Sequence, residues 1–119
     1  MNVYNEAHNL AQAVKESEEF KNYDSLRKKI DANPQLSEMV NDIQKKQLDL
    51  QMKQMSGQVE GDIQAQLTEI YQLMMRDPLL AEFFTAEARF SLMMQDVYKI
   101  LNEAVGLQFG FTGEEEKQA

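Results

Sequence analysis

The sequence predicts an all-α fold of about five helices, and three observations support this prediction. Met, Gln, Leu, Glu and Lys dominate the 119 residues, whereas Gly occurs 5 times and Pro twice; the common residues are good helix formers. No segment alternates apolar and polar residues with β-branched enrichment, as a half-buried strand would. The dipeptides Asn33-Pro34 and Asp77-Pro78 each lie between two stretches of helical periodicity.

Each of these dipeptides predicts that one helix ends and the next begins. A residue before Pro is disfavoured in the α region, Pro suits the first helical position, and Asn and Asp are strong N-caps. The apolar residues at matching offsets around the two prolines also agree: Tyr23, Leu26 and Ile30 match Leu67, Ile70 and Met74, and Leu36, Met39 and Val40 match Leu80, Phe83 and Phe84. The pattern predicts a helix-Pro-helix unit used twice.

The first helix is expected over about residues 2–16, with a narrow apolar stripe at Val3, Ala7, Leu10 and Val14. Ser17, followed by two acidic residues, reads as an N-cap for a second helix ending near Ala32. Two separate helices and one bent helix both fit this pattern.

The third helix is expected over residues 34–56, a length of about 33 Å, because Gly57 is a natural residue to follow a helix end. Its apolar face changes midway. Continuing the early face leads to a mostly polar strip, whereas three apolar residues project from nearly the opposite side: Leu48, Met52 and Met55. Two interpretations remain open: this half packs under another helix of the same chain, or it meets a second subunit.

The short, glycine-bounded link 57–61 predicts an antiparallel hairpin between the third helix and a fourth that follows Asp62. The fifth helix, over residues 78–105, carries one apolar stripe close to a heptad seam and a second stripe that includes Phe84, Met94 and Tyr98. A helix that is apolar on several sides is either central in the fold or shared across an interface. We therefore expect an interface formed by two sets of residues: Leu48, Met52 and Met55 on the third helix, and Phe84, Met94 and Tyr98 on the fifth.

Composition excludes several classes of function. The chain has no Cys and therefore no disulfides, thiolate metal sites or cysteine-ligated clusters, and its net charge of −8 disfavours direct nucleic-acid binding. No signal peptide and no membrane span are visible, so a cytoplasmic location is expected. Residues 1–106 are expected to form one domain, and residues 107–119 a mobile acidic tail. Two aromatic residues of that tail, Phe109 and Phe111, are alternatively available to dock on a partner.

The sequence contains few residues suited to catalysis. His8 is the single histidine, and no nucleophile–base pair, phosphate loop or metalloprotease motif occurs. Four helical acids, Glu69, Glu82, Glu87 and Asp96, could be imagined as metal ligands, but helical di-iron sites also use histidines that this chain lacks. We expect a protein that is not an enzyme and has neither a cofactor nor a metal.

Two runs give the sequence a resemblance to a known family. The run 47–57 is similar to the end of the long helix in the YlbF/YheA/YmcA group of small helical bacterial proteins, and the run 86–94 is similar to the group's last long helix. The N-terminal region is similar at Tyr4, Ala7, Leu10 and residues 17–20. The YheA-like branch fits best, and five positions match the family pattern best: Gln47, Gln51, Gly57, Glu87 and Arg89.

The resemblance implies an all-helical, self-associating protein of the cytoplasm of Gram-positive bacteria. Relatives in this group, YlbF and YmcA, join a third protein, YaaT, in a complex that acts with ribonuclease Y in RNA processing and affects competence, sporulation and biofilm formation. Those relatives are linked to cysteine-ligated iron–sulfur clusters, which this chain cannot hold through thiolates because it has no Cys. The resemblance therefore implies a partner-binding role without that cofactor.

These observations together predict a non-enzymatic helical adaptor that acts as a homo-oligomer, most simply a dimer, and through other proteins. An alternative is a holdase-like helical chaperone that uses a Met-rich surface. A metal enzyme built on helical carboxylates is a third and weaker alternative. Glu87 and Arg89 are two residues apart and do not face each other on one helix, so each either finds a partner elsewhere or is solvated. Our hypothesis for them is an ion pair between helices or between subunits.

Overall fold

The computed structural model describes residues 2–57 and 61–106. Helices account for most of these residues, and neither range contains a strand. The elements are α1 (Val3–Lys15), α2 (Glu18–Asp31), α3 (Pro34–Ser56), α4 (Ile63–Met74) and α5 (Pro78–Val105). The all-α class and the five predicted helices are confirmed. The tail predicted over residues 107–119 lies outside the described residues.

Both prolines begin a helix behind a capping side chain, as the sequence predicts. Asn33 Oδ1 accepts hydrogen bonds from the backbone N–H groups of Gln35 (3.1 Å) and Leu36 (3.2 Å). Asp77 Oδ1 accepts one from the N–H of Leu79 at 2.8 Å. These bonds satisfy N–H groups that the first turn of a helix leaves without a partner.

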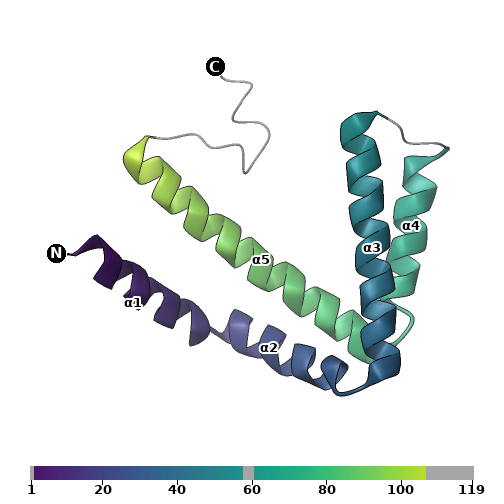
Figure 1. Cartoon of the computed structure of the whole chain (residues 1–119), viewed down its shortest axis with the longest axis horizontal. Coiled ribbons are helices and arrows are strands. Elements are labelled where there is room, and N and C mark those ends of the chain that lie inside the picture. The colour runs from purple at the N-terminus through teal and green to yellow at the C-terminus, as the bar shows by residue number, and fades with distance from the viewer. Residues whose placement is uncertain (1, 58–60, 107–119) are drawn as a thin grey trace.

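The junction between α1 and α2 is a true helix boundary. Ser17 Oγ accepts a hydrogen bond from the N–H of Phe20 at 3.1 Å and donates one to the carbonyl of Val14 at 2.6 Å. One hydroxyl thus ends α1 and caps α2, which resolves the alternatives left open by the sequence in favour of two helices. The two helices follow one another in nearly the same direction (Figure 1).

The helices form a flat V (Figure 1). α5 packs along α2 in one arm, with α1 continuing beyond α2, while α3 and α4 form the predicted antiparallel hairpin in the other. The principal extents are 48 × 39 × 16 Å. The radius of gyration is 17.5 Å, whereas a compact domain of this length has about 13.5 Å. The fold is therefore open, and each arm exposes much of its surface.

The hydrophobic core is concentrated at the apex of the V, where α2, α3 and α5 meet, and extends between α3 and α4. Its buried members are Leu26, Ile30, Val40, Ile43, Leu50, Ile70, Leu80, Phe83, Phe84 and Ala86. Tyr23 of α2 stacks on Phe90 and Phe83 of α5, with ring centroids 5.3 and 5.7 Å apart. Paired aromatic rings add to the burial energy and fix their geometry, so this cluster holds α2 against α5.

The two long helices end in the same way. Gly57 after α3 and Gly106 after α5 have φ values of +74° and +70°, in the left-handed region that glycine adopts without strain. The chain can therefore leave each helix abruptly. The helix that follows the first of these glycines, α4, runs antiparallel to α3 (Figure 1).

Candidate interaction surfaces

The far half of α3 presents an exposed apolar ridge formed by Leu48, Met52 and Met55. These side chains are 56%, 59% and 82% exposed. The opposite side of α3 packs on α4, where Leu50 and Ile70 are buried. The ridge therefore lies on the side of α3 away from α4, and Figure 1 shows α4 on the outer side of α3. Of the two interpretations, packing of these three residues under another helix of the same chain is therefore wrong.

The change of face along α3 has a simple cause. The early apolar side of α3 packs at the apex, and its polar continuation still lies against α4, with Leu50 as its buried apolar contact. Gln47 lies on this side and places its Nε2 3.8 Å from the sulfur of Met74. A strip that looks too polar to pack is thus the hairpin interface, and the more apolar strip is exposed.

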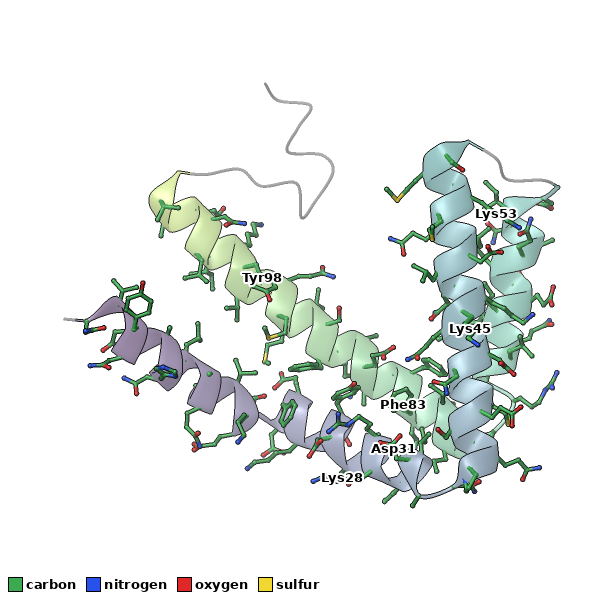
Figure 2. The ribbon with its side chains drawn as sticks, viewed as in Figure 1. Lys28, Asp31, Lys45, Lys53, Phe83 and Tyr98 are labelled. Atoms are coloured by element: carbon green, nitrogen blue, oxygen red, sulfur yellow. The ribbon has the colours of Figure 1, made fainter. Side chains whose placement is uncertain are left out.

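Lysines border the ridge, and some of them form no ion pair. Lys53 pairs with Asp49 at 3.2 Å. Lys45 and Lys46 line a shallow hollow with Leu48, Asp49 and Met52, and within residues 2–57 and 61–106 they have no ion-pair partner. Figure 2 shows Lys45 and Lys53 on α3. The ridge is therefore apolar with a cationic border, in a chain of net charge −8.

The predicted interface residues of α5 do not join this ridge. Phe84 is 5% exposed and makes an edge contact with Phe83, with ring centroids 5.2 Å apart, so it is a core residue and is removed from the proposed interface. Met94 is half-buried, and Tyr98 is exposed. Tyr98 lies on the distal half of α5, well separated from α3 (Figure 2). The six predicted residues thus divide into one core residue and two separate surfaces.

A second exposed apolar surface, which we call the α1–α5 arm, comprises α1 and the distal part of α5 (residues 87–105). None of the residues in these two segments is buried. The exposed large apolar side chains of the arm are Val3, Tyr4, Leu10, Leu92, Tyr98, Ile100, Leu101 and Val105. Several of them lie in the apolar stripes predicted from the sequence. Helical periodicity does not separate stripe residues that are covered within the chain from those that are not.

Glu87 and Arg89 lie near the apex end of the arm. Glu87 is half-buried, and this burial raises the pKa of its carboxyl. Arg89 is exposed beside a hollow between α2 and α5 that Asn22, Leu26 and Glu82 also line. Neither residue makes an ion pair in the described part of the chain. The expected ion pair is therefore absent within the described residues, and pairing across subunits stays a prediction.

The exposed side of α2 contains an ion pair of its own. The carboxylate of Asp24 lies 3.0 Å from the Nζ of Lys28 and also accepts a hydrogen bond from Arg27. These hydrogen bonds lower the pKa of Asp24. Arg27 also lies over the ring of Tyr23, at 5.9 Å from its centroid. Arg27 and Lys28 thus form ion pairs within their own helix, whereas Lys45 and Lys46 have no ion-pair partner among the described residues.

In the part of the chain that the structure describes, no metal-binding cluster suggests a reactive centre. The four acids considered as metal ligands do not come together, and no three metal-binding side chains cluster in the ranges that the structure describes. His8 is exposed on α1. Gln51, a family-pattern position, is exposed on α3, and no helix in the described ranges is long and apolar enough to cross a bilayer. The chemistry of the described surface is that of apolar and charged contacts.

Comparison with known proteins identifies the family. The family model described as "Control of competence regulator ComK, YlbF/YmcA" matches residues 3–106, which include all five helices. The chain belongs to the YlbF/YmcA family. The match to this family confirms the resemblance drawn from the α3 and α5 runs, and it covers both arms of the V.

Relatives of this YlbF/YmcA family member span nearly the same length. A UPF0342 protein of Symbiobacterium thermophilum is 35% identical over 111 residues, covering 92% of this chain and 99% of that protein. A UPF0342 protein of Caldicellulosiruptor saccharolyticus is 38% identical over 109 residues, covering 90% of each. One from Halothermothrix orenii is 35% identical over 116 residues, covering 97% of each. The five-helix unit therefore makes up nearly the whole of these relatives.

Proposed function

We propose that this protein is a non-catalytic regulatory adaptor that self-associates and binds other proteins, and that it belongs to the YheA-like branch of the family. The observation that carries the proposal is the amount of apolar surface that one copy leaves uncovered. Two separate apolar surfaces, the α3 ridge and the α1–α5 arm, are exposed on a molecule with a small core. Apolar patches of this kind mark interaction sites on soluble proteins.

The family description supports a regulatory role for those contacts. It names control of the competence regulator ComK. For this chain we propose action in the cytoplasm, in competence, sporulation and biofilm control or in a ribonuclease Y-type complex. Such a role here would work through helix surfaces, because the chain has no Cys to bind a cluster through thiolates.

Self-association is tested by light scattering on the purified chain at micromolar concentration. The expected mass is twice the 13.8 kDa of one chain. A single species of one chain mass across the accessible concentrations would contradict the proposal. Thermal unfolding followed by circular dichroism in the same samples provides the control that the chain is folded.

Partner binding is tested by recovering the protein from its native cytoplasm with what it holds. An adaptor is expected to retain one or two defined proteins in constant proportion. A chaperone of the holdase type would retain many unfolded chains. Loss of the retained proteins in Met52→Glu, with the oligomer intact, would assign their binding to the α3 ridge.

A further inference from the structure

The α1–α5 arm leaves a helix without support. α1 has 13 residues, none of them buried, and it packs principally against the beginning of α2. An isolated helix shorter than about 12–15 residues is marginal in water. Its apolar stripe, Val3, Ala7, Leu10 and Val14, is exposed except at Val14, which is half-buried. α1 therefore needs contacts with another apolar surface to be stable.

The distal part of α5 offers a surface of the matching kind. The side of α5 that packs on α2 through Phe83 and Phe90 continues, at helical spacing, to Val97 and Leu101. Val97 is half-buried and Leu101 is 49% exposed. Beyond Glu87 this strip has no charged side chain: Met94, Val97, Leu101 and Val105 follow one another along it. The core side of α5 thus extends, uncovered, past the end of the core.

The α3 ridge is less suited to pair with itself. It is bordered by Lys45, Lys46 and Lys53, and only Lys53 has an ion-pair partner in the described ranges. In a two-fold dimer the same patch meets itself, so the net positive charge of this border would approach the same charge on the second copy. Lys is depleted in interface cores, and like charges placed together oppose association. Self-pairing is therefore favoured at the arm over the ridge.

Apolar side chains are exposed along the length of the arm. Eight large apolar side chains of the arm, which include Tyr4, Ile100 and Val105, are each at least 38% exposed on one copy. A standard interface buries roughly 800 Å² on each partner and draws on about 20–30 residues a side. A second copy seated on the arm would supply that burial and cover both α1 and distal α5.

We propose that a second copy of this chain occupies the α1–α5 arm, so that α1 and distal α5 of the two copies form one four-helix layer around a two-fold axis. This assignment rests on the proposed self-association and specifies its surface. It also leaves the α3 ridge uncovered in the dimer.

The test places one glutamate at each of three sites and measures the dimer dissociation constant by sedimentation. Leu101→Glu would bury an unpaired charge in the interface and is expected to weaken the dimer on the order of 100-fold or more. Gln95→Glu adds the same charge on another side of α5, and Met52→Glu adds it on the α3 ridge. Both controls are expected to dimerise as the parent chain does.

The outcomes separate this inference from the proposed function. Dissociation by Met52→Glu with an unaffected Leu101→Glu would overturn the arm assignment while self-association stands. A parent chain that is monomeric at all concentrations would overturn both.

If Leu101→Glu fails to fold, hydrogen exchange on the parent chain decides. Amides of α1 are expected to gain protection as concentration rises through the dimer transition. Protection of α1 that does not change with concentration would overturn the assignment, because α1 would then be held within its own chain.

Discussion

At the scale of single residues, Glu87 combines an ionisable group with a partly buried position. It lies one turn from Phe83 and Phe90 on α5, and its burial raises the pKa of the carboxyl. Burial disfavours the charged form of an acid unless a cation compensates. Because no ion pair reaches Glu87 in the described residues, we expect the ionised side chain to oppose folding of the monomer.

The pH dependence of stability follows from the direction of this shift. A folded-state pKa above the unfolded value favours folding below the unfolded pKa, and this contribution is lost as pH rises through the folded pKa. Glu87→Gln is therefore expected to stabilise the monomeric protein at pH 7 and to have little effect at pH 3. Urea unfolding at both pH values measures this, with the exposed Glu82→Gln as control. Destabilisation by Glu87→Gln at pH 7 would instead show that the carboxylate has a cationic partner, such as Arg89 of a second copy.

At the scale of elements, the caps and prolines were the most predictable part of the fold. Asn33, Ser17 and Asp77 each cap a helix through a bond to a nearby backbone N–H, so the sequence around them is sufficient. Long-range packing was less predictable. Phe84 and Tyr98 share an apolar region of α5, yet one is core and the other exposed, because the buried residues of α5 all lie in its first part, from Leu80 to Ala86.

The same limit explains the α3 ridge and the arm. Periodicity predicts which residues of a helix share a side. Which helix covers that side depends on the direction in which the chain leaves each of the two Pro turns, and periodicity does not predict this direction. The sequence therefore indicated two apolar surfaces on α3 and α5 without showing that they lie on different arms. The narrow apolar stripe of α1 indicated weak packing, but not that this helix would lack any buried residue.

Loss of the α5 cap is expected to destabilise the whole fold, because α5 supplies Leu80, Phe83, Phe84 and Ala86 to the core. Asp77→Ala removes the acceptor for the N–H of Leu79 and is expected to lower the free energy of unfolding by about 1 kcal/mol. Asp77→Asn keeps a capping oxygen and is expected to retain most of that stability. Urea denaturation compares the two variants, and equal losses in both would contradict the capping role.

At the scale of the whole molecule, the open V links stability to concentration. A core confined to the apex leaves α1 and distal α5 dependent on contacts outside the chain. If a second copy supplies those contacts, folding and association are coupled by mass action. The apex is then stabilised by the folding of one chain, and the α1–α5 arm by the association of two chains.

The expected sign of this coupling is a thermal midpoint that rises with protein concentration. For a dimer of this size the increase is about 2–4 °C for each tenfold in concentration. Leu101→Glu is expected to melt at a temperature that does not depend on concentration. If the melting temperature of the parent chain also did not depend on concentration, the folded monomer would need no second copy.

The separation of the two arms has a consequence for valency. In a dimer joined through the α1–α5 arms, the two α3–α4 hairpins lie outside the shared layer, and each presents one copy of the ridge. A target with two matching sites would be bound at both ends, the second contact being intramolecular. Such tethering can raise avidity by about 10²–10⁴-fold without any new contact. A weak ridge could thereby distinguish paired targets from single ones.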